Sequence, residues 1–366
     1  MPTQNNALLP PMQVYSAGVV TSIGMSLDAS YAALNAGLDN FQETSFANRG
    51  VPVIGAAIEP SAHPAIAKPN ARGHERLANF VRMAIEECLI NANLEVPCAL
   101  KVPILLVLGE TDRYGRSDKL ASACQSAYAS LLKNASQTPF FKAEVGSVGT
   151  LEALKAAAKI ISEGEYSSVL LVGVDSWLNT PDIQYAIGRD RLLSSENACG
   201  FIPSEGAAAV LLSAPNALDS KPNGCPDNVP LYIAGLGQGQ ESASLYTDEP
   251  CYGTGLSKAM RSALEQAETA LHHVQLELTD ITSEAYFFDE IAYARTRLLR
   301  QSMPQGFRRI HPSSCMGNTG AACGATLLAL AWKESQINQK TSPTLISLSA
   351  SSEARGAIVL KRKEDL

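Results

Sequence analysis

The feature that most constrains the fold of this chain is a repeated alternation of short apolar runs with longer amphipathic segments. Short runs rich in β-branched residues are typical of buried strands, and apolar residues three or four positions apart are typical of helices. In the first part of the chain this pattern predicts strands at 14–20, 102–108, 141–145, 168–174 and 207–213. It predicts helices at 26–36, 76–92, 119–132 and 151–162. The order indicates an α/β fold built in layers.

A turn-rich segment, 219–228, interrupts this alternation with prolines and a glycine and has no apolar period. The alternation then restarts. We predict strands at 231–235, 285–288, 344–348 and 357–361, and helices at 255–271 and 320–332. The same order of elements on both sides suggests two related halves, 12–218 and 229–362, although their residues are too dissimilar to establish the relation.

The composition excludes several classes of protein. With 46% hydrophobic residues among 366, the chain can bury a large core. Its charged residues form no long block of one sign, and its net charge of -7 argues against general affinity for nucleic acid. No stretch resembles a membrane helix or a secretory signal, so we expect a cytoplasmic protein without a membrane span.

The eight cysteines show no CxxC spacing. Paired spacing of that kind is typical of zinc and redox centres. We therefore expect reduced, mostly buried thiols, with no bound metal and no cofactor.

Four stretches resemble the β-ketoacyl synthases and occur in that family's order. GVVTSIG at 18–24 is similar to GVVSPLG, and GE followed by VLLVGVDS within 164–176 is similar to a helix end and the AGGVD strand. GFIPSEGAAAV at 200–210 resembles GFVPGEGAGALV, and GNTGAA at 317–322 resembles GHTEGAAG. The third match is the most specific, because its glycines and Glu205 stand at fixed offsets before a predicted strand. We expect Glu205 to accept hydrogen bonds from nearby N–H groups in a crowded loop, although the loop is also explained as pure architecture.

The resemblance implies a thiolase-like fold: two pseudo-symmetric halves, each a mixed five-stranded sheet with helices, in a five-layered αβαβα core. It also implies a dimer, formed with itself or with an active ketosynthase, in which the strand at 141–145 pairs across the interface. A further implied partner is an acidic acyl carrier protein, which would dock on a basic patch. The candidate patch comprises Arg295, Arg297, Arg300, Arg308 and Arg309. An ordinary solvated helix face explains these residues equally well.

In the family, a cysteine nucleophile begins a buried helix, and here its position is taken by Ser147. A hydroxyl needs a neighbouring base to become nucleophilic, whereas a thiol at a helix N-terminus is partly ionised at neutral pH. A helix dipole, worth about 1 kcal/mol, does not replace that base. The alternative role of Ser147 is to cap the helix that follows.

The family's two catalytic histidines are also missing from their motifs. The second is replaced by Asn318, which can donate a hydrogen bond to an oxyanion but cannot carry a proton, and the family's lysine position is held by Ser313. The first would follow the strand predicted at 285–288, where Asp289 and Glu290 are the nearest candidate bases. Acidic residues beginning a helix are the alternative explanation.

Other candidates lie near the C-terminal motifs. His311 is the only histidine near one of these segments and is a candidate base; Cys315 is a candidate replacement nucleophile. Both also fit structural roles. The family's gating loop, GFGGTN, is replaced by SASSEARG at 349–356. By resemblance, the substrate-binding positions are Gly317, Ser351 and Ser352.

Three functions remain open. The first is a non-condensing subunit similar to a chain length factor, in fatty acid, polyketide or aryl polyene biosynthesis. The second is an acyltransferase or thioesterase that acts on acyl carrier protein through Ser147. The third is a condensing enzyme with an atypical site. In each, the resemblance implies an acyl-phosphopantetheine thioester as substrate and no separate cofactor.

Overall fold

One mixed sheet organises the chain. The computed structural model describes residues 11–59, 71–218, 230–338 and 340–366. Within them, ten strands form a continuous sheet in the order β10-β9-β11-β12-β8-β1-β7-β6-β4-β5. The strands of the first half are β1 (Gln13–Val20), β4 (Ile104–Val107), β5 (Phe140–Ala143), β6 (Ser168–Ser176) and β7 (Glu205–Ser213). Those of the second half are β8 (Leu231–Gln240), β9 (Leu276–Thr279), β10 (Arg308–Ile310), β11 (Thr344–Ser349) and β12 (Ala354–Arg362).

The two halves have the same topology. In each, the strands lie in the order third, second, fourth, fifth, first when they are numbered along that half. The pairing directions agree as well: the two outer pairs are parallel, and the two inner pairs are antiparallel. The halves meet where β1 and β8 pair antiparallel. The predicted pair of pseudo-symmetric halves is therefore confirmed, while the predicted joint at 219–228 lies outside the described residues.

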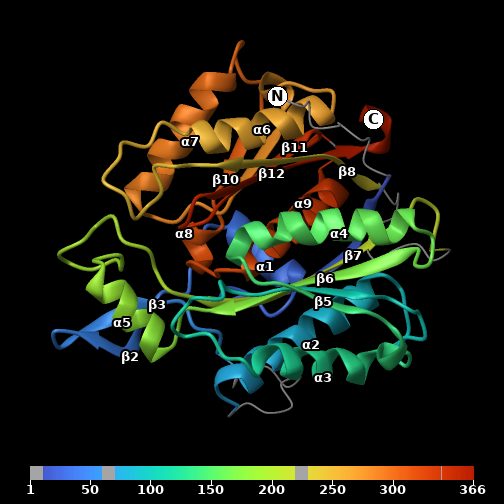
Figure 1. Cartoon of the computed structure of the whole chain (residues 1–366), viewed down its shortest axis with the longest axis horizontal. Helices are drawn as coiled ribbons and strands as arrows, with labels where there is room; N and C mark the ends of the chain where they lie inside the picture. The colour runs from blue at the N-terminus through green and yellow to red at the C-terminus, as the bar shows by residue number, and fades with distance from the viewer. Residues whose placement is uncertain (1–10, 60–70, 219–229, 339) are drawn as a thin grey trace.

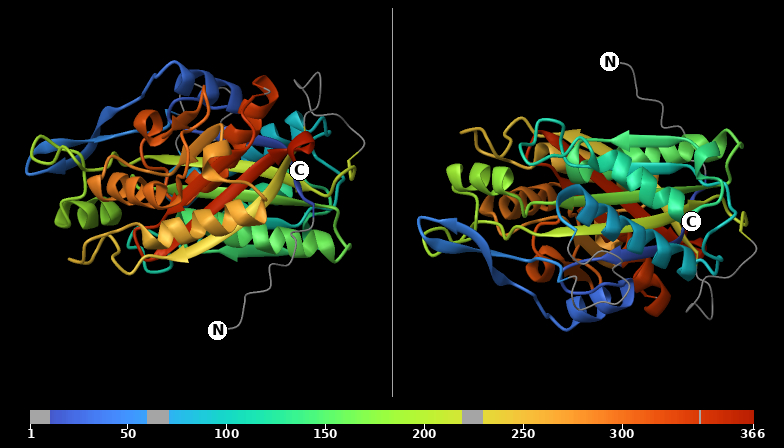
Figure 2. Two further views of the ribbon diagram at one scale, coloured as in Figure 1. Left: turned by 90° about the horizontal axis from the view of Figure 1, so that it is seen from above. Right: turned by 90° about the horizontal axis from the view of Figure 1, so that it is seen from below.

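The helices complete five layers, as predicted (Figure 1). The outer layers are α2 (Gly73–Asn91) with α3 (Leu120–Leu131), and α6 (Thr254–Gln266) with α7 (Ala285–Leu298). The central layer is α4 (Gly149–Ser162) with α9 (Ala322–Ile337), between the two half-sheets. Views from above and below show each outer pair covering its own face (Figure 2).

The central helix α9 explains how the layers hold together. Most of its side chains are buried, including Leu327, Leu330 and Trp332. A helix that is apolar all round is stable only in the interior, and α9 packs against strands of both halves. The largest apolar cluster therefore lies around it, and separate clusters lie beneath the outer helix pairs.

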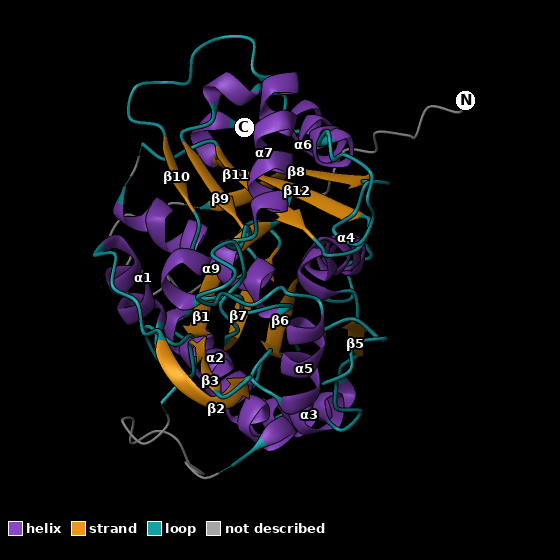
Figure 3. Cartoon of the chain, turned by 90° about the vertical axis from the view of Figure 1, so that its left-hand side faces the viewer, coloured by secondary structure: helices purple, strands orange, loops and turns teal. Residues whose placement is uncertain are grey.

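Shorter elements lie around the sheet, and the hairpin among them is at one end of the strands. They are α1 (Leu27–Asn35), the hairpin β2 (Gln42–Asn48) and β3 (Val51–Gly55), α5 (Thr180–Gly188) and α8 (Ser313–Met316). The hairpin and α5 lie together at this end, as the side view shows (Figure 3). The sequence patterns did not predict the hairpin, because its strands are largely exposed and lack apolar alternation.

The predicted strand at 285–288 is wrong. These residues form the first turn of α7, and the true strand is β9, nine residues earlier. The polar Glu277 interrupts the apolar run of β9, and its burial is made possible by ion pairs with Arg295 and Arg309. Residues 276–279 thus form a strand because of their pairing with distant strands and arginines, which a local sequence pattern does not show.

Alternate glycines of β8 allow helix α6 to approach the sheet closely. A Cβ atom on Gly237 would lie 1.8 Å from the carbonyl oxygen of Ala259. We expect Gly237→Ala to lower the free energy of unfolding by about 1–3 kcal/mol or more, through overpacking, in urea denaturation. Gly188→Ala is the control, because no atom outside the neighbouring backbone of its own helix lies within 4 Å of its added Cβ. Equal losses in the two variants would contradict this explanation.

Candidate functional site

Ser147 lies in a short turn of 3-10 helix (Gly146–Val148) between β5 and α4. Its hydroxyl donates a hydrogen bond of 2.8 Å to the Asp280 carboxylate. No side-chain capping bond is formed at the N-terminus of α4. The structure therefore assigns the Ser147 hydroxyl a partner from the other half of the chain, in place of the alternative capping role.

Asp280 follows β9 directly, at the carboxyl end of a parallel strand. Its carboxylate also accepts hydrogen bonds of 3.0 and 2.9 Å from the backbone N–H of Ser349. Burial raises the pKa of Asp280 to about 7, against the opposing effect of these hydrogen bonds. Asp280, and not Asp289 or Glu290, is thus the residue that follows a strand and faces Ser147.

A small cavity of about 40 Å³ surrounds this pair. Its lining comprises Glu110, Arg113, Ser147, Trp177, Arg191, Asp280, Thr282, Phe287, Asn318, Gly320, Cys323, Ser349, Ala350 and Ser351. No histidine is among these described residues. Sites for organic ligands usually have about 300–1,000 Å³, so this cavity has no room for an acyl chain.

Two guanidinium groups line the cavity that contains Ser147. Arg113 forms ion pairs with Asp175 and, at 2.9 Å, with Asp182, and its guanidinium lies 3.9 Å from the centre of the Trp177 ring. Arg191 forms a buried ion pair with Glu284 at 2.8 Å. Moving either arginine would leave its buried carboxylate partner without a compensating charge. We therefore expect both arginine side chains to keep their positions in the cavity wall.

Two of the sequence candidates line the cavity. The Asn318 side-chain oxygen accepts a hydrogen bond of 2.9 Å from the Gly320 N–H, which stabilises the local turn. Ser351 accepts a bond of 3.3 Å from Arg191. Gly317 and Ser352 do not line the cavity. Gly317 instead has a positive φ of 70° in a buried turn, a conformation that favours glycine.

The three candidate bases lie elsewhere. Asp289 is exposed on α7. Glu290 is fully buried in an ion pair of 2.5 Å with Arg355. His311 contacts Thr279, with 2.5 Å between Nδ1 and Oγ1. Burial, helped by a nearby arginine, lowers the pKa of His311 to about 4, so the ring is neutral at pH 7 but is not beside Ser147.

A thiol in the cavity was missed. Cys323 lies in the first turn of α9 and lines the space around Asp280. Burial, and then the nearby Asp280 carboxylate, raise the pKa of this thiol, which keeps it protonated. Cys315, the cysteine singled out from the sequence, is buried outside the cavity. Without an adjacent imidazole, Cys323 does not replace the family's activated thiolate.

The candidate basic patch is largely neutralised. Arg295 and Arg309 pair with Glu277, and Arg308 pairs with Glu334 at 2.7 Å. Arg297 and Arg300 remain exposed. Most of these arginines therefore support buried carboxylates, which leaves fewer free charges for an acidic partner than the sequence implied.

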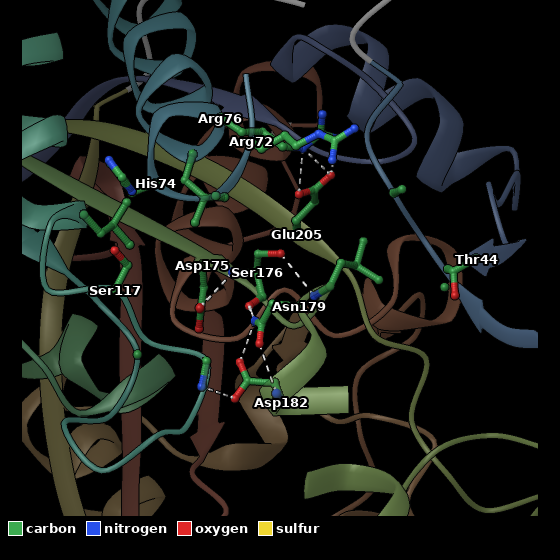
Figure 4. Close-up of a pocket in the computed structure, with 18 of the residues that line it drawn as sticks. Thr44, Arg72, His74, Arg76, Ser117, Asp175, Ser176, Asn179, Asp182 and Glu205 are labelled. Carbon is green, nitrogen blue, oxygen red and sulfur yellow. Dashed lines mark hydrogen bonds and ion pairs between the residues drawn. The ribbon is translucent and has the colours of Figure 1, made fainter. Parts of the chain in front are cut away.

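A larger cleft of about 760 Å³ lies beside the cavity, between the start of α2, strand β2 and helix α5 (Figure 4). Glu205 forms an ion pair of 2.6 Å with Arg76 there and accepts a 3.0 Å bond from the backbone N–H of Ile58. The expected role of Glu205 as an acceptor is therefore confirmed. Arg113 lines both the cleft and the cavity, so its side chain and its ion pairs form part of the wall that separates them.

The Asp280 carboxyl makes stability depend on pH. The folded state holds its proton up to about pH 7, whereas an unfolded aspartate releases it near 3.8. The stabilisation that the Asp280 carboxyl contributes is therefore fully present below pH 3.8 and is lost as the pH rises towards 7. We expect the free energy of unfolding of Asp280→Asn to fall less between pH 4 and pH 7 than that of the wild type.

Chemical denaturation across this pH range checks the prediction, with Asp289→Asn as a control that removes an exposed carboxylate nearby. The control should follow the wild-type curve. Parallel curves for Asp280→Asn and the wild type would show that the Asp280 proton is not linked to folding.

No family model matches this sequence, and no curated protein matches it. Solved structures do match its fold. A β-ketoacyl synthase from Burkholderia phymatum STM815 is 16% identical, with a TM-score of 0.72 and coverage of 96% of this chain and 99% of that one. A ketosynthase in complex with its chain length factor, from Xenorhabdus doucetiae, is 12% identical, with a TM-score of 0.68 and coverage of 99% and 100%.

A third match is a type II polyketide synthase acyl-carrier protein in complex with its ketosynthase, which is bound to the hexaketide. It is 14% identical, with a TM-score of 0.73 and coverage of 96% and 99%. The TM-scores and the coverage establish the fold: the chain has the thiolase-like architecture of ketosynthases and chain length factors. Among its described helices, none has the length and apolar character to cross a bilayer.

Proposed function

We propose that this chain is a non-condensing, ketosynthase-like subunit, comparable to a chain length factor, in fatty acid, polyketide or aryl polyene biosynthesis. One observation carries the proposal: the group at the nucleophile position is Ser147, hydrogen-bonded to Asp280 in a charged cavity of about 40 Å³. This site retains the frame of a thioester-binding centre without its thiolate and imidazoles.

The chemistry of condensation explains why these exchanges matter. A condensing enzyme must hold an acyl group on a nucleophile and stabilise the enolate that decarboxylation produces. Here Asn318 uses its side-chain oxygen within its own turn, and the Asp280 oxygens are engaged by the Ser147 hydroxyl and by the Ser349 N–H, so neither side chain stands in place as an imidazole would.

The edge of the sheet supports a partner subunit. Strand β5 lies at one end of the described sheet, with Phe141 45% exposed and the following Val145 37% exposed. An uncovered strand edge with apolar side chains readily pairs with another chain. We propose that the partner is an active ketosynthase, that acyl carrier protein serves the pair, and that the pair works in the cytoplasm without a further cofactor.

Partner formation tests this proposal. The chain should form a one-to-one complex with a ketosynthase of the same cell in size-exclusion chromatography with light scattering. The complex should convert acyl and malonyl carrier proteins to β-ketoacyl product, and Ser147→Ala should leave that activity unchanged. Phe141→Lys should weaken the complex, and Phe288→Lys, which changes an equally exposed phenylalanine on α7 in the other half of the chain, is the matched control. A complex whose activity disappears with Ser147→Ala would refute the non-condensing role.

A second function is favoured by a single contact. Because Asp280 has a pKa of about 7 and accepts a hydrogen bond of 2.8 Å from the Ser147 hydroxyl, the pair resembles a nucleophile with its base, as an acyltransferase or thioesterase requires. Two nearby amides are already engaged: Ser349 N–H binds Asp280, and Ala350 N–H binds the Ala354 carbonyl at 3.1 Å. They cannot also stabilise an oxyanion.

Intact-protein mass spectrometry after incubation with an acyl thioester separates the two functions. The non-condensing role predicts no added acyl mass in the wild type. An acyl adduct that is absent from Ser147→Ala would establish the acyl-transfer function instead.

A further inference from the structure

The loop that joins β11 to β12 forms one wall of the Ser147 cavity. We call residues 350–353 the lid, because Ala350 and Ser351 line the cavity together with Ser349, the last residue of β11. The lid thus separates Ser147 and Asp280 from one side of their surroundings. Whether it can move decides whether an acyl thioester reaches the pair.

Arg355 holds the lid from within. Its side chain is fully buried, and one terminal nitrogen, Nη1, donates to the carbonyl oxygens of Ala350, Ser352 and Ala354, at 3.0, 2.6 and 2.8 Å. A single guanidinium therefore binds the backbone on both sides of the turn. Such charge-assisted bonds are stronger than neutral ones.

The same guanidinium is anchored to helix α7. Arg355 Nε pairs with Glu290 at 2.5 Å, and Nη2 donates to the Tyr286 hydroxyl at 2.8 Å. Glu290 also accepts a bond of 2.7 Å from the Ser349 hydroxyl. Opening the lid would separate this buried charge from its partners, which is costly in a low-dielectric interior.

Additional bonds fasten the lid to other elements. The Glu353 carbonyl accepts a bond of 2.8 Å from the N–H of Glu241, at the end of β8. Arg191 donates to Ser351 at 3.3 Å from the opposite side of the cavity. The lid is therefore attached to three separate parts of the fold.

We infer that Arg355 is a positioning residue that fixes this lid permanently shut over Ser147, in place of a loop that opens for acyl thioesters. The inference rests on the proposed function and deepens it. A fixed lid denies thioesters access to the cavity, independently of the chemistry of Ser147.

Alkylation of Cys323 measures the opening of the lid, because this thiol lines the cavity beneath it. The native protein is treated with iodoacetamide, and modification of each cysteine is followed by peptide mass spectrometry. The exposed Cys199 should react within the first samples, and Cys323, which is only partly exposed, should react at least tenfold more slowly. Arg355→Gln should speed Cys323 modification at least tenfold, and Tyr286→Phe, which removes one anchoring bond, should speed it less.

Local opening and general loss of stability are separated by repeating the reaction in low concentrations of urea. Modification through the lid should be nearly independent of urea, whereas modification through global unfolding rises steeply with it. Arg295→Gln is the matched control, because it removes an arginine from another ion pair of α7. It should leave the urea-independent rate unchanged.

Two results would overturn the inference: rapid, urea-independent modification of Cys323 in the wild type, or no change in that rate in either lid variant. If Arg355→Gln does not fold, Tyr286→Phe decides alone. These results are distinct from failure of the proposed function. Rapid Cys323 modification would refute the fixed lid even if the chain forms no condensation product. Formation of a β-ketoacyl product would refute the proposed function, whatever the rate of Cys323 modification.

Discussion

Glu290→Ala is expected to lower the free energy of unfolding by about 3–5 kcal/mol, the range for breaking a buried ion pair by removing one partner. Glu290 and Arg355 are both fully buried, so the variant leaves an arginine charge in the interior without its carboxylate. The Ser349 hydroxyl loses its acceptor as well. Urea denaturation followed by circular dichroism measures the change.

Asp289→Ala is the matched control, because it removes the adjacent, exposed carboxylate from the same helix. Surface substitutions of this kind usually change stability by no more than about 0.5 kcal/mol. A loss below about 1 kcal/mol for Glu290→Ala would mean that other groups compensate the charge of Arg355. Glu290 would then not be the residue that anchors Arg355 and the lid.

Arg113→Ala is expected to have an effect of similar size, about 3–5 kcal/mol, because two carboxylates lose their shared partner. Asp175 and Asp182 are buried, and Arg113 links them beside the ring of Trp177. The loss should be smaller at low pH, where protonation removes the unpaired negative charges. Denaturation curves at neutral and acidic pH measure both changes.

Arg116→Ala provides a control in the same loop. Arg116 pairs with Glu144 at 2.5 Å, but both side chains retain about 20% of their exposure. Partly solvated pairs contribute about 0–1 kcal/mol. Similar losses for the two variants would show that the loop, and not the paired charges around Ser147, determines stability.

The sequence predicted the frame well because the frame depends on local signals. Apolar runs indicate strands such as β6 and β7, and the glycines and glutamate before β7 carry the family resemblance. The uninterrupted apolar surface of α9 likewise predicts a buried helix. The order of these elements suggested the two halves, and the family resemblance implied the five layers.

The site was less predictable because its contacts are made by residues far apart in the chain. Ser147 was identified from its position in the family pattern. Its partner Asp280 was missed because the polar Glu277 interrupts the apolar run of β9, so the strand before Asp280 was not predicted. The replacement of the gating motif was visible in the sequence. The contacts by which Arg355 holds the lid could not be predicted from the sequence, because its partner Glu290 is 65 residues away.

The proposed function requires that this frame holds no condensing centre of its own. The most direct test is to incubate the isolated chain with acyl and malonyl carrier proteins and to analyse the carrier-bound products by mass spectrometry. Under this requirement we expect neither β-ketoacyl product nor loss of carbon dioxide from the malonyl group. Accumulation of a β-ketoacyl carrier protein that stops in Ser147→Ala would contradict it.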